Sequence, residues 1–137
     1  MTPAKTSTAH QQTGFLLVTA AGLTPIALAY GFAPIGSMDW LFGIDAASVN
    51  ARHIFRAFMG LYLALIGFWI AGAFVTRLRR PALLSLFVFM IGLAFGRLVS
   101  LAVDGWPNAL LIFYLVLEIT FGFIGWRMLT MADPTPH

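Results

Sequence analysis

Four long stretches of this sequence carry almost no charged residues, and this pattern constrains the fold more than any other feature. A helix needs about 20 mostly apolar residues to cross a bilayer. We predict spans at residues 14–33, 55–76, 81–103 and 108–129. They form one domain, residues 14–130, with polar tails at 1–13 and 131–137. Because the second and fourth spans are apolar all round, a soluble helical bundle with one apolar stripe per helix is not favoured.

The composition agrees with a lipid environment. Hydrophobic residues make up 60% of the 137 residues and charged residues only 9%, whereas soluble domains carry about a quarter. The net charge is +3, but the basic residues are scattered at segment ends, so we expect no nucleic-acid partner. The chain has no cysteine, which excludes disulfides, thiolate metal sites and iron–sulfur clusters.

The third predicted span contains one arginine, Arg97, and this residue tests the assignment. An arginine at the centre of a bilayer costs about 2.5 to 3.5 kcal/mol on the insertion scale. The span also contains 13 Leu, Ile, Phe and Val residues. These contribute about 4 to 8 kcal/mol in total as an upper bound, so the segment is still expected to insert.

The basic residues near the span ends predict an orientation, because Lys and Arg concentrate on the cytoplasmic side of a membrane. One side holds Lys5, Arg77, Arg79, Arg80 and Arg127. The other side holds Arg52, Arg56, Asp39, Asp45 and Asp104. We therefore expect both termini in the cytoplasm and an all-α, antiparallel four-helix bundle. Within the outer loop at residues 35–53, the apolar run around Trp40 predicts a short segment along the membrane surface.

Small residues at helical spacing predict which faces of the spans pack together, since membrane helices associate where backbones approach closely. We expect three such stripes to face the interior of the bundle. They are Arg56, Gly60, Ala64, Gly67 and Ala71; Tyr114, Glu118, Gly122 and Gly125; and Gly92 and Gly96 with Arg97, Ser100 and Asp104. Pro81 is expected at the first position of the third span, after a turn at residues 76–81.

The inward-facing charges predict a buried polar cluster in the outer half of the bundle. Helix rise places Arg97 and Glu118 at depths that a long arginine side chain can bridge, so we expect them to pair. The predicted cluster comprises Asn50, Arg56, Arg97, Ser100, Asp104, Tyr114 and Glu118. Three interpretations stay open: ion pairs that only fix the helix register, the lining of a small polar cavity that holds a head group, an anion or a proton, or a contact with another subunit.

No motif in the sequence predicts catalysis or a bound cofactor. The three histidines, His10, His53 and His137, lie outside the middle of the spans, so a haem held between helices is not expected. There is no glycine-rich phosphate loop, no HExxH pattern and no nucleophile and base at motif spacing. We expect a non-enzymatic protein without metal or cofactor.

Three segments make the chain resemble the DUF4345 family, small bacterial membrane proteins of four predicted spans. They are Arg56 to Ala64, the string from Gly92 to Ser100 followed by Asp104 and Gly105, and Glu118 before Gly122. The resemblance covers roughly residues 34–128. It implies the four-span architecture and points to Arg56, Arg97, Ser100, Asp104 and Glu118, but it supplies no reaction. We expect the protein to lie in the bacterial inner membrane.

Two hypotheses for function follow. The first is an accessory or structural subunit of a larger membrane protein complex, because the chain is small, has short loops and lacks a catalytic set. The alternative is a membrane binder or carrier of a small anionic or amphiphilic ligand that uses the predicted Arg, Asp and Glu cluster. Membrane lipid and other membrane protein subunits are the expected partners.

Overall fold

The structure is a computed structural model that describes residues 3–131, with side chains from Ser7 onward. The predicted C-terminal tail lies outside the described residues apart from Met131, as does the Lys5 side chain used for the orientation. The described chain forms five helices and no strand. They are α1 (Pro3–Gly31), α2 (Pro34–Phe42), α3 (Val49–Phe74), α4 (Thr76–Val103) and α5 (Ala109–Thr130).

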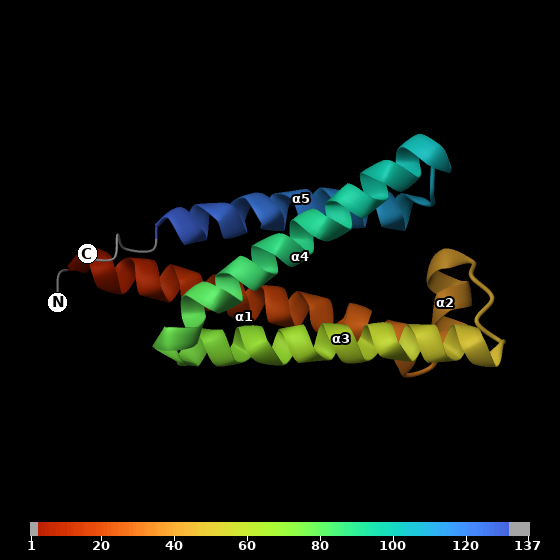
Figure 1. Cartoon of the computed structure of the whole chain (residues 1–137), viewed down its shortest axis with the longest axis horizontal. Coiled ribbons are helices and arrows are strands. Elements are labelled where there is room, and N and C mark those ends of the chain that lie inside the picture. Colours follow the sequence, from red (N-terminus) through yellow and green to blue (C-terminus); the bar gives the residue numbers. More distant parts are fainter. Residues whose placement is uncertain (1–2, 132–137) are drawn as a thin grey trace.

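Four of these helices are long and apolar enough to cross a membrane, namely α1 from Ser7 onward, α3, α4 and α5. The predicted multi-pass helical bundle is therefore confirmed. Figure 1 shows α1 and α3 side by side, with α4 crossing from α3 towards α5. The start of α1, the end of α5 and the α3–α4 turn lie at one end, which we call the terminal end. The opposite end, which carries α2 and the α4–α5 loop, is the α2 end.

Polar side chains cap α3 and α5, which both begin at the α2 end. The Ser48 hydroxyl accepts a hydrogen bond from the Ala51 backbone amide at 3.1 Å, and the side-chain Oδ1 of Asn108 accepts one from the Leu111 backbone amide at 3.0 Å. Both caps satisfy a backbone donor that the first helical turn leaves free. The Asn108 amide also donates to the Leu41 carbonyl oxygen at 3.1 Å, so the start of α5 is tied to α2.

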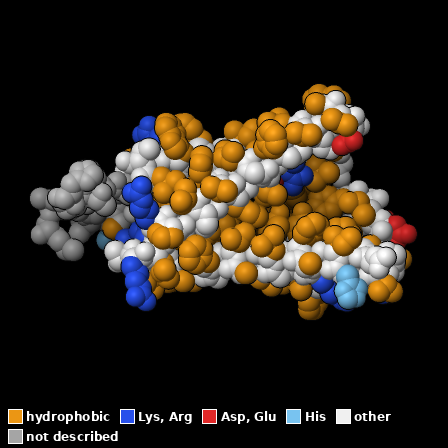
Figure 2. Space-filling view, viewed as in Figure 1, with side chains coloured by type: hydrophobic (Ala, Val, Ile, Leu, Met, Phe, Trp, Pro, Cys, Tyr) orange, Lys and Arg blue, Asp and Glu red, His pale blue; other side chains and the backbone are white. Residues whose placement is uncertain are grey.

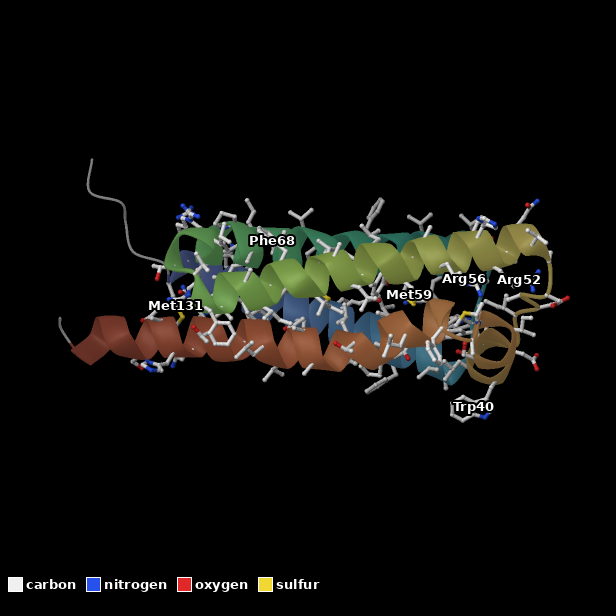
Figure 3. All side chains as sticks on the ribbon, turned by 90° about the horizontal axis from the view of Figure 1, so that it is seen from below. Trp40, Arg52, Arg56, Met59, Phe68 and Met131 are labelled. Carbon is white, nitrogen blue, oxygen red and sulfur yellow. The ribbon has the colours of Figure 1, made fainter. Side chains whose placement is uncertain are left out.

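The predicted surface segment is the helix α2. It begins at Pro34, which suits a first helical turn, and ends at Gly43, whose φ of 66° favours glycine. Met38 is fully buried against the bundle, whereas Trp40 is 84% exposed. Figure 3 shows Trp40 pointing away from the bundle. This two-faced arrangement is suited to a helix at the membrane interface, where an indole ring can lie among lipid head groups.

The turn between α3 and α4 is shorter than predicted. Only Val75 separates the two helices, and α4 already begins at Thr76, so Pro81 lies inside the helix rather than at its first position. Proline in this place removes one backbone hydrogen bond. Other contacts hold the start of α4: Arg79 donates through Nη2 to the Ala73 carbonyl oxygen at 3.1 Å, and Leu78 donates to the Val75 carbonyl oxygen at 2.9 Å.

The core is formed mainly by α1, α3 and α4 and contains a buried side-chain hydrogen bond. Trp69 is fully buried and donates through Nε1 to the Ser85 hydroxyl at 3.0 Å, which links α3 to α4. Residues 3–13 of the predicted N-terminal tail form the first turns of α1, and its last two residues bond to other helices. Gln12 donates to the Met128 carbonyl oxygen at 3.0 Å and Thr13 to that of Ala73 at 3.1 Å.

Of the three small-residue stripes, only the one on α5 faces the interior. Glu118, Gly122 and Gly125 are buried there, and Tyr114 is partly buried. The prediction for α3 is wrong, because four members of its stripe, Arg56, Gly60, Ala64 and Gly67, are exposed and only Ala71 is partly buried. Large residues pack inward instead: Tyr62, Ile66 and Trp69 form the buried face, together with the small residues Gly72 and Ala73.

The reason for this outcome is the contact area that large side chains provide. In lipid, helices associate through van der Waals packing, and rings that interdigitate provide more of it than glycines do. Tyr62 and Trp69 both pack edge-on against Phe89 of α4, with ring centroids 5.1 and 5.6 Å apart. The prediction for Gly92 and Gly96 is also wrong, since both are exposed and a Cβ on either would meet nothing within 4 Å.

Candidate ligand-binding site

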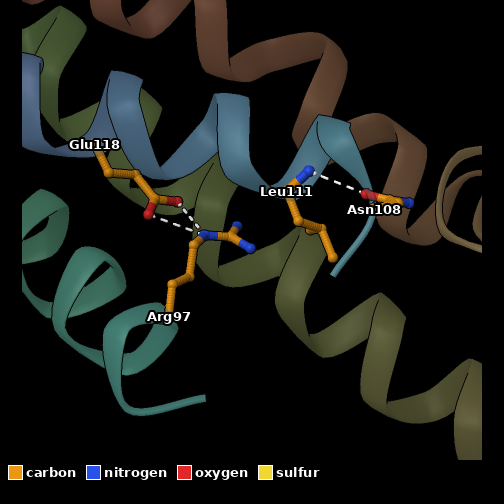
Figure 4. Close-up of polar contacts among 4 residues, drawn as sticks. All are labelled: Arg97, Asn108, Leu111 and Glu118. Atoms are coloured by element: carbon orange, nitrogen blue, oxygen red, sulfur yellow. Dashed lines mark hydrogen bonds and ion pairs between the residues drawn. The ribbon is translucent and has the colours of Figure 1, made fainter. Parts of the chain in front are cut away.

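Arg97 of α4 and Glu118 of α5 form an ion pair between neighbouring helices, as the sequence predicted. The Arg97 Nε donates to both carboxylate oxygens of Glu118, at 2.8 and 2.9 Å (Figure 4). The Glu118 side chain is 8% exposed and that of Arg97 is 22% exposed. A charged group this far from water is stable only with a partner of opposite charge. Each of the two residues therefore compensates the cost of burying the other's charge.

The terminal nitrogens of Arg97 lie on the side of the guanidinium away from Glu118, towards Leu111 (Figure 4). No residue that the structure describes accepts a hydrogen bond from these terminal nitrogens. The Tyr114 ring lies beside the guanidinium carbon, with its centroid 5.7 Å away, which places the cation near an electron-rich face. Arg97 therefore has unused N–H donors next to an aromatic wall.

Ser100 and Asp104 do not join the ion pair, contrary to the prediction. The Ser100 hydroxyl donates to Asp104 Oδ2 at 2.6 Å, and both residues are exposed at the α2 end of α4. They lie on the same helix as Arg97 but make no hydrogen bond to it within the described chain. Near the membrane surface a carboxylate keeps its water, so it gains little from moving to a buried partner.

Arg56 and Asn50 also stand apart from the pair. Both are exposed on the first turns of α3, and Figure 3 shows Arg56 and Arg52 near the α2 end. Neither side chain forms a hydrogen bond or ion pair with the part of the chain that the structure describes. Arginines at this depth reach water directly. The predicted cluster of seven residues thus reduces to Arg97, Glu118 and Tyr114.

These three residues line a cavity of about 580 Å³, including its open mouth, between α1, α3, α4 and α5. Most of its walls are apolar, among them Leu23, Met90 and Phe121. The polar residues that line it are Thr19, Tyr30, Tyr62, Arg97, Tyr114 and Glu118. The Thr19 hydroxyl already donates to the Phe15 carbonyl oxygen at 2.8 Å, so the three phenols and the ion pair supply the accessible polar groups. We call this space the central cavity.

Tyr30 and Tyr62 are site residues that the sequence interpretation missed. Their rings meet edge-on with centroids 5.4 Å apart, and Tyr30 also contacts Phe42, Phe55 and Phe58. Tyr62 is 7% exposed. The sequence did contain one indication for Tyr62, its position in the middle of an uncharged span, where a phenol must find a polar neighbour or a cavity.

A second, smaller pocket of about 320 Å³ lies between α4 and α5 at the α2 end. Its lining includes Arg97, Ser100 and Leu111, together with Gly105 and Pro107 of the loop. We call it the loop pocket. On the face seen in Figure 2, a hollow lined by hydrophobic side chains lies between α4 and α3, with Lys or Arg atoms inside it. Arg97 is the residue that lines both spaces.

The described residues hold no group of three or more His, Asp and Glu side chains that could bind a metal ion. The chemistry of the site is therefore that of one neutral ion pair, three phenols and apolar walls. These groups can hold a polar head by hydrogen bonds and an apolar body by contact.

Comparison with known proteins places the chain in a family. A family model described as "Domain of unknown function (DUF4345)" matches residues 12–129, and the chain belongs to this family. No curated protein and no solved structure gives a match. The resemblance noted from the motifs is confirmed, and it extends through the first span as well.

Proposed function

We propose that this protein binds an amphiphilic molecule in the central cavity, without chemical conversion. The observation that carries the proposal is that the Arg97–Glu118 pair lines an open, apolar space rather than a sealed core. Pockets for small molecules combine apolar walls with a few polar groups that fix the orientation of the ligand. The lining of the central cavity fits this description.

The arrangement of the walls supports entry from the lipid. Val18 and Gly22 of α1 line the central cavity and are also exposed on the outer surface of the bundle. The helix α1 packs along α3 over much of its length but touches α5 through few residues. A ligand dissolved in the bilayer can therefore enter along α1 without passing through water, which suits a molecule with a long apolar body.

The experiment uses single-chain amphiphiles that carry a photoreactive diazirine in the acyl chain, with uncharged, anionic or cationic heads. The protein is purified in detergent, irradiated with each probe and analysed by mass spectrometry. The variant Leu117→Trp places a larger side chain in the cavity wall, and Leu84→Trp is the matched control because Leu84 is 52% exposed and does not line the cavity.

Saturable labelling by at least one probe is expected in the natural protein and in Leu84→Trp, with a loss of most labelling in Leu117→Trp. Equal labelling of both variants, or labelling that never saturates, contradicts the proposal. A fall in labelling of both variants indicates a damaged fold, which circular dichroism of each variant detects. In that case Gly22→Leu, a second change in the cavity wall, is used in place of Leu117→Trp.

A second candidate function, as an accessory subunit of a larger membrane complex, is supported by small residues on the outside of α3. Gly60 and Gly67 are exposed and would meet nothing within 4 Å if they carried a Cβ. Such a face lets another membrane helix approach closely. Gly67→Leu is expected to release a partner that co-purifies under gentle conditions, with Leu61→Phe on the exposed surface of α3 as the control. A preparation of the natural protein without any partner speaks against this role.

We propose the bacterial inner membrane as the location, with both termini in the cytoplasm. The support is the distribution of charge: Arg77, Arg80 and Arg127 are exposed near the terminal end, where Figure 2 shows Lys and Arg atoms and, among the described residues in view, no acidic atoms, whereas the opposite end carries acidic atoms beside its own Lys or Arg atoms. Basic residues of short loops favour the cytoplasmic side.

A further inference from the structure

The free N–H donors of Arg97 define the hydrogen-bonding groups that the head of a ligand must carry. A guanidinium has five N–H donors and no acceptor. The ion pair uses the one on Nε, and the terminal nitrogens face away from Glu118 (Figure 4). A head group bound here must therefore accept hydrogen bonds, and an aliphatic end would leave these donors unsatisfied.

The charges that line the two spaces add up to zero. Arg97 and Glu118 are the charged residues of the central cavity, joined at 2.8 Å, and Arg97 is the charged residue of the loop pocket. Both carboxylate oxygens already accept from Arg97, so the positive charge is locally neutralised. A ligand with a charged head would add a third, uncompensated charge to an apolar space, which is costly.

Space for a head group exists beside the free donors. The loop pocket lies on the side of Leu111, towards which the terminal nitrogens of Arg97 are directed. Ser100 and the loop residue Gly105 line it as well, and the Ser100 hydroxyl oxygen can accept a hydrogen bond from a ligand hydroxyl. The phenols of Tyr30, Tyr62 and Tyr114 lie on the side of the central cavity.

We infer that the ligand is an amphiphile with an uncharged head that accepts hydrogen bonds, such as an ester, carbonyl or hydroxyl group, held by the terminal nitrogens of Arg97. This inference rests on the proposed function and narrows it to one class of ligand. The apolar body lies in the central cavity and the oxygen-bearing head lies beside Arg97. Carboxylates, phosphates and ammonium compounds are disfavoured by the charge balance of the site.

The test compares three lipids that share one acyl chain and differ in head charge: a monoacylglycerol, an N-acyl taurine and an acyl choline. Each competes with the photoreactive probe that labels the protein best, and the concentration for half-maximal displacement is measured. The sulfonate and the quaternary ammonium stay charged in lipid. The monoacylglycerol is expected to reach half-maximal displacement at a concentration at least about tenfold lower than either charged lipid. The reason is that an unpaired charge in a desolvated site costs more than about 1.4 kcal/mol.

The variant Glu118→Gln sharpens the comparison, because it leaves the side chain's size unchanged and gives the site a net positive charge. We expect its preference to move to the acyl taurine, whose sulfonate then takes the place of the missing carboxylate as the partner of Arg97. Leu84→Trp, away from the cavity, is expected to keep the preference of the natural protein.

The outcomes separate the inference from the proposed function. Strongest displacement by the acyl taurine or the acyl choline in the natural protein overturns the uncharged head but leaves the amphiphile site in place. Unchanged preference in a folded Glu118→Gln also overturns it. No displacement by any of the three lipids, together with no saturable labelling, overturns the proposed function itself. The ranking of the three lipids in the natural protein tests the uncharged head group even if Glu118→Gln fails to fold.

Discussion

Arg97 approaches Glu118 through its Nε alone, so the ion pair between α4 and α5 is complete while the outer edge of the guanidinium stays free. This geometry satisfies the carboxylate and still leaves donors for another molecule. An arginine that served only to fix the helix register would gain more from a bidentate contact through its terminal nitrogens. The pair is thus both a link between helices and one wall of a cavity.

Removing one member of the pair is expected to destabilise the bundle more than removing both. Arg97→Gln or Glu118→Gln leaves a single charge in an apolar surrounding, and each is expected to cost about 3 kcal/mol or more. The double variant leaves two neutral amides and is expected to cost clearly less than the sum of the single changes. Unfolding free energies in mixed micelles give the comparison. If the double variant costs as much as the sum, the two residues are not coupled.

Gly72 is expected to be required at the contact of α3 with α4. A Cβ on Gly72 would lie 2.3 Å from the Ala82 Cβ and 3.2 Å from the Leu78 carbonyl oxygen. Gly72→Ala is therefore expected to destabilise the protein by about 1 to 3 kcal/mol through overpacking. Gly67→Ala is the control on the same helix, since its Cβ meets nothing within 4 Å.

The control variant is expected to be neutral or slightly stabilising, because alanine favours helix over glycine by up to about 1 kcal/mol. Thermal unfolding of both variants in the same detergent measures the difference. Equal melting temperatures for Gly72→Ala and Gly67→Ala would show that α3 and α4 do not approach each other as closely as described.

Ser85 is expected to contribute to stability as the acceptor for a buried indole. Trp69 is 0% exposed, and Ser85→Ala leaves its Nε1 proton without an acceptor. This change is expected to lower the free energy of unfolding by about 1 to 3 kcal/mol. Thr120→Ala is the control, because Thr120 is exposed and its hydroxyl donates only to the Val116 carbonyl oxygen of its own helix. Its unfolding free energy should change by no more than about 0.5 kcal/mol. Similar losses in both variants would contradict the assigned role.

The absence of cysteine from the sequence makes the orientation directly measurable. Ala47→Cys lies in an exposed loop at the α2 end, and Thr130→Cys is exposed near the terminal end. In intact cells, a thiol reagent that does not cross membranes is expected to label Ala47→Cys, and to label Thr130→Cys only after permeabilisation. The opposite pattern would reverse the proposed orientation.

The sequence predicts the four spans and the Arg97–Glu118 contact because each follows from the residue types within the spans. An uncharged stretch of sufficient length has few alternatives to a spanning helix, and two opposite charges in neighbouring spans have strong reason to meet. The chain departs from the prediction where a choice between faces had to be made. Periodicity shows that Gly60, Ala64 and Gly67 share one face of α3, but not whether that face packs inward or meets lipid.

The missing part of the site has a similar cause. Tyr62 faces the central cavity because its ring packs against Phe89 and Tyr30, which come from two other helices. No spacing within α3 contains that information. Arg56 and Asp104 carry charges like those of the pair, but they lie near the ends of their helices, where exposure to water replaces the need for a partner. Depth in the bundle, rather than residue type, separates these outer charges from the pair.

The most direct test of the account is the position of crosslinks formed by a monoacylglycerol that carries a diazirine in its acyl chain. In the natural protein, peptide sequencing by mass spectrometry is expected to place the saturable crosslinks on residues that line the central cavity, such as Leu23, Ile26 and Leu117. Crosslinks confined to exposed positions such as Leu84 and Val116, with none in the cavity, would contradict the claim that the bundle holds an amphiphile.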